Sequence, residues 1–341
     1  MGQDLSLAET PLRIVVVGSR SSPWLSELAN LPDEAKIVAW GESEAELQKG
    51  GKSYTEANVL FCSSGTATDI SRLIKAMPYL EWIHCLFAGV DHILCKEMQD
   101  HPELIVTNAK GVFSSSLAEY VMFACGFFTK DCQRLLKNKE SCLYDRFTMG
   151  EIRGKTMGII GYGDIGQSCA RLAKAYGCKV IGLRRNPGRS ATDEFVDKVV
   201  GNSPEDLLQV MRESDYLVVC AALTIETRGM IGEAQLIHSK KGQVLVNIGR
   251  GALLDEEALC AALESGLLYA AALDVFTVEP LPADSPLWRL PNVLISPHNA
   301  DMTAEFRHES VRLFCRLVED YVEAGYSAAK LVNKVDVFSG Y

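Results

Sequence analysis

The chain has 341 residues, of which 48% are hydrophobic and 23% are charged, and its formal net charge is −10. Two domains are expected, because a single hydrophobic core stops growing beyond about 250 residues. The composition is that of a folded globular protein and argues against an intrinsically disordered chain. The negative balance also argues against nucleic acid as a partner, since phosphate binding needs clustered lysine and arginine side chains.

The eleven cysteines are scattered, without a Cys-x-x-Cys pair or a Cys/His spacing typical of a metal site. Several lie in apolar runs, as Cys62, Cys125, Cys220 and Cys315 do. We therefore expect buried free thiols in a reducing compartment and no bound metal. The chain shows no basic region followed by an apolar core at its start, and its longest apolar stretch is too short to span a bilayer. These features favour a cytoplasmic protein without a membrane partner.

The first hundred residues alternate short apolar runs with polar or helix-forming segments. Runs rich in β-branched residues are typical of buried parallel strands. Strands are expected at residues 12–18, 58–62, 82–87 and 104–107, with a helix at 69–77 that ends before a proline. Strands alternating with helices predict a parallel α/β domain.

Residues 117–136 form a long apolar stretch made of good helix formers. The stretch is hydrophobic all round, which is unusual for a surface helix. We expect it to be buried between domains or subunits, and it therefore favours a homodimer.

A second α/β series follows, with expected strands at residues 156–160, 179–183, 216–220, 243–248, 269–275 and 293–296. An amphipathic pattern at 303–324 predicts a helix that returns to the first domain. The predicted fold class is α/β, with two Rossmann-like doubly wound parallel sheets. The second domain, residues 111–298, would be inserted into the first, residues 1–110 and 299–341.

Gly161, Gly163 and Gly166 form a GxGxxG string between an expected strand and an expected helix. In this setting the first glycine permits a tight turn, the second lets a pyrophosphate approach the backbone, and the third lets helix and strand pack closely. The helix N-terminus then offers N–H groups to phosphates. The sequence therefore predicts a dinucleotide site at Gly161, Tyr162, Gly163, Asp164, Ile165 and Gly166.

The strand at 179–183 is followed by Arg184 and Arg185, and no carboxylate occurs before Asp193. An acid directly after this strand would bind the ribose 2′-hydroxyl of NAD, whereas guanidinium groups favour the 2′-phosphate of NADP. We expect NADP(H) to be preferred and NAD(H) to be usable. The alternative is a pair of solvated arginines in a loop.

Three downstream segments each place one ionisable residue just past an expected strand. They are VNIGRGALLDEEAL at 246–259, AALDVFTVEPLP at 271–282 and ISPHNADMT at 295–303. The carboxyl ends of strands border the ligand crevice in doubly wound sheets. Arg250, Glu279 and His298 are therefore expected to converge.

These segments, together with the glycine string, resemble the D-isomer-specific 2-hydroxyacid dehydrogenase family. Further matches are LEWIHCLFAGVDHI at 80–93, TNAKGVFSSSLAEYV at 107–121, EIRGKTMGIIGYGDIG at 151–166 and LTIETRGMI at 223–231. The resemblance implies reduction of a small 2-keto acid, in the range of glyoxylate and hydroxypyruvate, to a D-2-hydroxy acid. It also implies that 1–110 with 299–341 binds the substrate and 111–298 binds the dinucleotide, and that the two domains close about hinges near Gly111 and His298.

The resemblance implies roles that the chemistry of each side chain supports. His298 would protonate the carbonyl oxygen, because an imidazole exchanges protons near neutral pH, and Glu279 would orient it. Arg250 would bind the substrate carboxylate and polarise the keto group. Backbone N–H groups of Ala88, Gly89 and Val90 would hold the same carboxylate, and residues implied to contact the cofactor are Ala221, Ile248, Gly249, Asp274, which would face the carboxamide, and Asn299.

Two alternatives remain open. Phe87 precedes Ala88 where family loops often carry a small residue, so it favours a reductase of bulkier aromatic keto acids. A dinucleotide-sensing interaction protein, like the corepressors that resemble this family, would keep the fold without turnover. His84 and His92 flank the expected substrate loop and are interpreted as structural.

Overall fold

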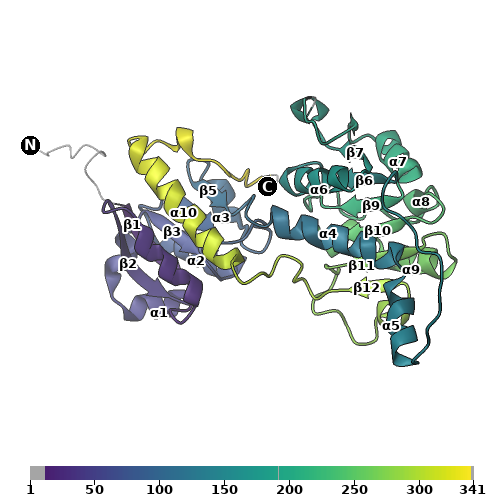
Figure 1. The fold of residues 1–341 in the computed structure, drawn as a ribbon. Coiled ribbons are helices and arrows are strands. Elements are labelled where there is room, and N and C mark those ends of the chain that lie inside the picture. The colour runs from purple at the N-terminus through teal and green to yellow at the C-terminus, as the bar shows by residue number, and fades with distance from the viewer. Residues whose placement is uncertain (1–11, 191, 339–341) are drawn as a thin grey trace, which may run out of the picture. The chain divides into compact units, whose positions relative to one another are not determined.

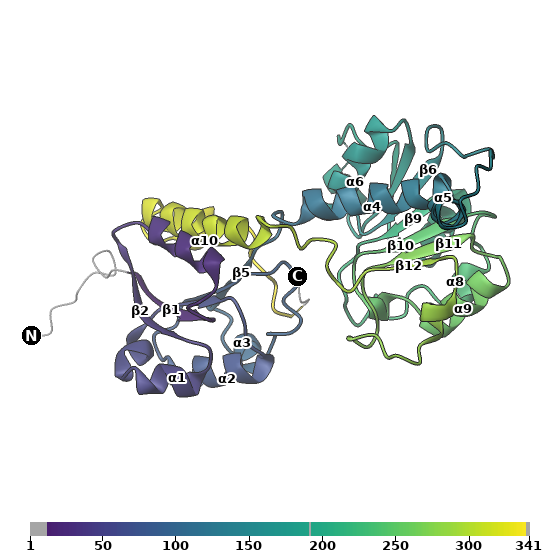
Figure 2. The ribbon, with the colours of Figure 1, turned by 60° about the horizontal axis from the view of Figure 1, so that its bottom comes forward.

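The computed structural model describes residues 12–190 and 192–338, so the ends of the predicted first domain lie outside the described residues. The described chain forms two compact units. Unit 1 comprises the residues up to Phe113 together with those from Thr303 onward, and unit 2 is Ser114–Met302. Each unit is a parallel sheet with helices on both faces (Figures 1 and 2). The predicted α/β class with two Rossmann-like parallel sheets is confirmed.

The sheet of unit 1 has the strand order β2-β1-β3-β4-β5 within the described residues. The strands are β1 (Leu12–Val17), β2 (Ala35–Gly41), β3 (Val59–Cys62), β4 (Trp82–Cys85) and β5 (Ile105–Asn108). Their side chains alternate between two apolar clusters, since successive strand residues point to opposite faces. Ile14 and Phe61 pack with Phe314 on one face, and Val15 and Leu60 pack with Leu73 on the other.

The helices of unit 1 follow from these two clusters. The face of Phe314 is covered by the 3₁₀ segment η2 (Pro23–Asn30) and by α10 (Phe306–Glu323). The opposite face carries α1 (Glu44–Lys49), α2 (Ala67–Ala76) and α3 (Lys96–Asp100), the first preceding the 3₁₀ segment η3 (Lys52–Glu56). The last described element is the short η7 (Ala328–Lys330). The helix predicted at 303–324 corresponds to α10, which starts at Phe306, three residues later than predicted.

The sheet of unit 2 has the order β12-β11-β10-β9-β6-β7-β8 among the described residues. Its strands are β6 (Thr156–Ile160), β7 (Lys179–Leu183), β8 (Lys198–Val200), β9 (Tyr216–Val219), β10 (Val244–Asn247), β11 (Ala270–Leu273) and β12 (Val293–Ile295). The chain runs outward from β6 to β8 and then crosses back to β9, on the other side of β6. This reversal is the topological switch point at which doubly wound sheets bind their ligands.

The helices of unit 2 are α4 (Ser114–Thr129), α5 (Cys132–Glu140), α6 (Asp164–Ala175), α7 (Pro204–Glu213), α8 (Glu233–Leu236) and α9 (Glu256–Glu264), with short 3₁₀ segments η4 (Pro187–Ser190), η5 (Gly251–Leu253) and η6 (Pro286–Arg289). No helix among the residues that the structure describes is long and apolar enough to cross a membrane.

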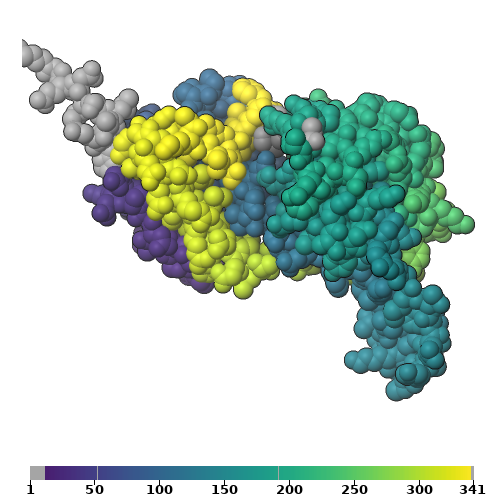
Figure 3. Space-filling view, turned by 45° about the horizontal axis from the view of Figure 1, so that its top comes forward, coloured from purple at the N-terminus to yellow at the C-terminus, as the bar shows by residue number. Residues whose placement is uncertain are grey.

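The single helical stretch expected at 117–136 is wrong, because the structure divides it. Asp131 adopts a left-handed conformation with φ 51°, and its side chain accepts a hydrogen bond from the Arg134 backbone N–H as the cap of a new helix. The first helix, α4, buries one face of its length against α6, but its Phe123 side chain is 55% exposed. The second, α5, buries no residue and projects from unit 2 together with the following loop (Figure 3).

Candidate active site

The glycine string lies at the switch point of unit 2, between β6 and α6. Gly161 has φ 99°, and a Cβ there would lie 2.5 Å from the Ala221 backbone nitrogen. A Cβ on Gly166 would lie 2.6 Å from the Gly161 carbonyl oxygen. These two positions need glycine for close packing, whereas a Cβ on Gly163 would meet no atom within 4 Å. Gly163 caps the N-terminus of α6, so open space lies beside the first N–H groups of the helix and fits a pyrophosphate.

Tyr162 is turned away from this open space. Its side chain is 1% exposed, and the ring packs over Gly182 of β7, where a Cβ would come within 2.5 Å of it. The Tyr162 hydroxyl donates a hydrogen bond to Asp193 Oδ2 at 3.0 Å. Burial and this carboxylate raise the pKa of Tyr162, so the phenol stays protonated and donates. Of the predicted loop residues, Tyr162 therefore offers a ligand only its backbone.

Arg184 follows β7 directly, as expected for the position that contacts the ribose. Its backbone N–H donates to the Val200 carbonyl at 3.2 Å, and its guanidinium donates to Ser190 Oγ. Arg185 is exposed in the same loop. Both oxygens of Asp193, the first carboxylate after the strand, accept hydrogen bonds from the protein, one from Tyr162 and one from the Phe195 N–H. The residue that directly follows β7 is therefore the cationic Arg184, and the carboxylate of Asp193 is hydrogen-bonded within the protein.

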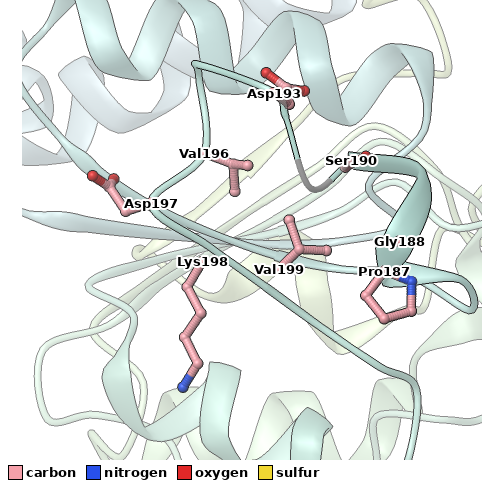
Figure 4. A pocket seen from close by; sticks show the side chains of 8 residues that line it. All are labelled: Pro187, Gly188, Ser190, Asp193, Val196, Asp197, Lys198 and Val199. Carbon is pink, nitrogen blue, oxygen red and sulfur yellow. The ribbon is translucent and has the colours of Figure 1, made fainter.

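A cavity of about 320 Å³ lies beside this loop, lined by Pro187, Gly188, Ser190, Asp193, Val196, Asp197, Lys198 and Val199. Its walls come from η4, from the segment that leads into β8 and from β8 itself (Figure 4). None of the glycine-string residues lines it. The cavity is therefore distinct from the open space at the N-terminus of α6.

Arg250 follows β10 in a turn built by Asn247, which is fully buried. The Asn247 amide donates to the Arg250 carbonyl at 3.0 Å, and its oxygen accepts from the Gly249 N–H at 3.1 Å. The Arg250 guanidinium donates to the Gly249 carbonyl at 2.9 Å. A Cβ on Gly251 would lie 1.8 Å from the Phe276 carbonyl carbon, so the turn packs tightly on the chain that follows β11. Ile248, beside this turn, is buried.

His298 and Glu279 form a direct pair. The Nδ1 atom of His298 lies 2.8 Å from Glu279 Oε2, and the other carboxylate oxygen accepts from the Phe276 N–H at 2.9 Å. An ionised carboxylate only accepts, so Nδ1 donates and Nε2 is left to face a ligand. The side chains are 44% and 35% exposed. His298 has φ 51°, and its N–H donates to the Asp274 carbonyl at 2.8 Å, which fixes this unusual conformation.

Asp274 supports the same loop with its side chain and is 2% exposed. Its Oδ1 accepts from the Asn299 and Ala300 N–H groups at 3.0 and 3.1 Å, and from the Ser296 hydroxyl. Ser296 was missed by the sequence interpretation, although a hydroxyl two residues before the histidine was a visible signal. Arg250, Glu279 and His298 thus follow three neighbouring strands, β10, β11 and β12, and all three lie in unit 2.

Ala88, Gly89 and Val90 lie in unit 1, in the loop after β4. The Ala88 carbonyl accepts from the Asn108 amide at 2.6 Å, and Val90 is buried. His84, on β4, is fully buried and hydrogen-bonded to Thr107, in keeping with a structural role.

Unit 2 is a dinucleotide-binding domain of the doubly wound class. This follows from its topological switch point, from the glycine string located there and from the cation that follows β7. Residues 121–300 match the model of the D-isomer specific 2-hydroxyacid dehydrogenase, NAD binding domain. The chain belongs to the D-isomer specific 2-hydroxyacid dehydrogenase family, which confirms the resemblance seen in the sequence.

The relatives are similar over most of the chain. A glyoxylate reductase of Aeropyrum pernix is 35% identical over 74% of this chain and 76% of its own length. A hydroxypyruvate reductase of Thermotoga maritima is 35% identical over 80% of this chain and 86% of its own. Among solved structures, a D-isomer specific 2-hydroxyacid dehydrogenase from Xanthobacter autotrophicus Py2, in complex with NADPH and MES, has a TM-score of 0.80 and 27% identity, covering 97% of this chain and 100% of that one.

Proposed function

We propose that this protein reduces a small 2-keto acid to a D-2-hydroxy acid with NADPH. The observation that carries the proposal is the His298–Glu279 pair, in which Nδ1 lies 2.8 Å from Oε2, and Arg250 follows a strand of the same sheet, β10. An imidazole oriented by a carboxylate is suited to proton transfer, and a guanidinium is suited to bind a carboxylate. The names of the relatives, glyoxylate reductase and hydroxypyruvate reductase, agree with this chemistry.

When bound, the nicotinamide cofactor would supply a hydride to the carbonyl carbon. Arg250 would hold the substrate carboxylate and polarise the carbonyl group. The Nδ1–H group of His298 donates a hydrogen bond to Glu279. Nε2 would deliver its proton to the carbonyl oxygen of the substrate as that oxygen gains negative charge. One hydride and one proton thus convert the keto group to a hydroxyl group, and Glu279 stabilises the imidazolium before transfer.

The N–H groups of Ala88, Gly89 and Val90 are proposed to bind the same carboxylate, which makes unit 1 the substrate-binding domain. Asp274, Asn299, Ile248, Gly249 and Ala221 are proposed to contact the cofactor. Phe87 is the residue that favours a bulkier, aromatic keto acid as substrate. Its ring centroid lies 6.0 Å from that of His92.

The preference for NADPH rests on Arg184, because Asp193 is engaged by the protein with both of its oxygens. Hydrogen bonds to a charged group contribute about 1.5–3 kcal/mol. Arg184→Ala should therefore lower kcat/KM for NADPH by roughly 10- to 100-fold and leave the value for NADH nearly unchanged. Equal losses with both cofactors, or a wild-type preference for NADH, would refute the assignment.

The function itself is tested by steady-state rates with NADPH on glyoxylate, hydroxypyruvate, pyruvate and phenylpyruvate. We expect turnover of at least one of the small acids and formation of the D-hydroxy acid by chiral analysis. Phenylpyruvate as the best substrate would instead favour the aromatic range suggested by Phe87. Tight cofactor binding without turnover of any acid would overturn the proposal and favour a dinucleotide-sensing protein.

We also propose that the protein is a homodimer formed through α4, α5 and the loop that follows. This region exposes large apolar side chains, namely Phe123, Leu135, Leu136, Leu143, Tyr144 and Met149. Such a concentration of exposed apolar groups is typical of an interface. Light scattering on the purified protein should give twice the chain mass, and Leu136→Glu should shift the mass toward one chain. A wild-type monomer would contradict the proposal.

A further inference from the structure

The loop that carries His298 is bound at two points by a single helix. Ser116 Oγ of α4 donates to the Ala300 carbonyl at 2.9 Å, and Tyr120 Oη lies 2.9 Å from Ser296 Oγ. Ser116 and Tyr120 are four residues apart, so they lie on one face of α4. Ser296 and Ala300 stand two residues before and two residues after His298. The helix therefore holds both ends of the five-residue loop.

The hydroxyl groups of Tyr120 and Ser296 continue into Asp274. Ser296 has one hydroxyl hydrogen, and the Asp274 carboxylate can only accept, so Ser296 donates to Asp274 Oδ1. The Ser296 hydroxyl is also hydrogen-bonded to the Tyr120 phenol at 2.9 Å, so the two hydroxyls and the carboxylate form one connected series. Burial raises the pKa of Tyr120 more than the hydrogen bond with Ser296 lowers it, so the phenol stays protonated. The same Oδ1 atom accepts hydrogen bonds from the Asn299 and Ala300 N–H groups. The series of hydrogen bonds therefore ends on the loop that carries His298.

We propose that Tyr120 and Ser116 are positioning residues for the reaction, which act through Ser296, Asp274 and Ala300 to hold His298 in place. The two hydroxyls and the carboxylate are connected by hydrogen bonds, and a series of hydrogen bonds that ends on a carboxylate is stronger than its separate bonds. His298 has a left-handed backbone, a conformation that a non-glycine residue keeps only where its surroundings fix it. The inference rests on the proposed function, because it assigns these hydroxyls a part in that reaction.

The test compares kcat, KM for the keto acid and thermal stability of Tyr120→Phe, Ser116→Ala and Ser296→Ala with those of the wild type. A small misplacement of a reacting group lowers the rate sharply. We expect kcat to fall about tenfold in Tyr120→Phe and Ser296→Ala, with KM changed less than about twofold. The primary isotope effect with deuterated NADPH should rise, because hydride transfer becomes limiting. The double variant of Tyr120 and Ser296 should be no slower than Ser296→Ala alone, since both belong to one chain of bonds.

Ser296→Thr keeps the hydroxyl group and should restore most of the lost kcat. Ser115→Ala, which removes an exposed hydroxyl from the neighbouring position of α4, should leave kcat unchanged, as should Tyr79→Phe at a 66% exposed position of unit 1. Unchanged kcat in all three test variants, or a Ser296→Thr protein as slow as Ser296→Ala, would overturn the inference while the proposed function stands. A wild type without turnover would overturn both.

Discussion

His84 gives the most quantitative prediction, because its imidazole is fully buried and neutral. Nδ1 lies 2.8 Å from Thr107 Oγ1, and the Trp82 indole donates to the same oxygen at 2.8 Å. Thr107 Oγ1 thus joins the indole and the imidazole, while His84 Nε2 is buried without a hydrogen-bond partner among the described residues. The ring packs against both Phe61 and Phe314, with centroids 5.8 and 5.0 Å away. Burial lowers the pKa of His84 to about 3.

The stability of unit 1 should consequently depend on pH. The unfolded imidazole, with a pKa of about 6.5, binds a proton that the folded one excludes until the pH approaches 3. The unfolded state therefore gains protons first, and stability falls as the pH falls through this window. The loss approaches about 1.4 kcal/mol per pH unit well below pH 6.5. Above pH 6.5 the contribution of His84 is constant.

His84→Phe removes the titrating group and keeps an aromatic ring in the stack. The variant should be less stable than the wild type at pH 7.5, since the hydrogen bond between Thr107 and residue 84 is lost. Urea unfolding would be followed at pH 7.5, 6.5, 5.5 and 4.5 by tryptophan fluorescence, which reports mainly on unit 1 because Trp24, Trp40 and Trp82 lie there.

The difference in free energy of unfolding between the wild type and the variant should shrink as the pH falls, by about 1.4 kcal/mol between pH 5.5 and 4.5. The exposed His101, replaced by Gln, is the control and should leave the pH dependence of the wild type intact. Parallel curves for wild type and His84→Phe would refute the reasoning.

Three further substitutions test the site of unit 2. Glu279→Gln should lower kcat by about 10²-fold or more, because the amide cannot stabilise the imidazolium. The melting temperature should change little, since the position is partly exposed. A kcat within a few-fold of wild type would contradict the role assigned to Glu279. Gly166→Ala places a Cβ 2.6 Å from the Gly161 carbonyl and should destabilise unit 2 by about 1–3 kcal/mol and weaken NADPH binding, measured by thermal unfolding and cofactor fluorescence. Gly163→Ala meets no atom within 4 Å, so it should weaken cofactor binding without the same loss of stability.

The sequence predicted those features that depend on neighbouring residues. The glycine string was informative because its strand and helix adjoin it, and Arg184 because it directly follows β7. Strands β2 and β8 were missed, since both are edge strands with exposed or partly exposed residues that lack a buried run. The break between α4 and α5 depends on the backbone of Asp131, which apolar composition does not report.

The inward turn of Tyr162 and the support of the His298 loop could not be predicted in this way. Tyr162 faces Gly182 and Asp193, which belong to a different strand and a later loop. Tyr120 and Ser296 are 176 residues apart, and nothing local in either segment indicates the other. Such pairs are set by how α4 packs beside the sheet, which is a property of the folded unit.

The geometry of the His298–Glu279 pair follows from the sheet, because the ladder of hydrogen bonds continues past the strand ends. The Asp274 N–H donates to the Asn247 carbonyl at 3.0 Å, and the His298 N–H donates to the Asp274 carbonyl at 2.8 Å. The backbone at His298 is thereby tied through Asp274 to Asn247, which builds the turn of Arg250. Replacing the Glu279 carboxylate with an amide leaves this ladder intact. A loss of rate in that variant would then report the missing charge beside the imidazole, since the backbone that places it would be unchanged.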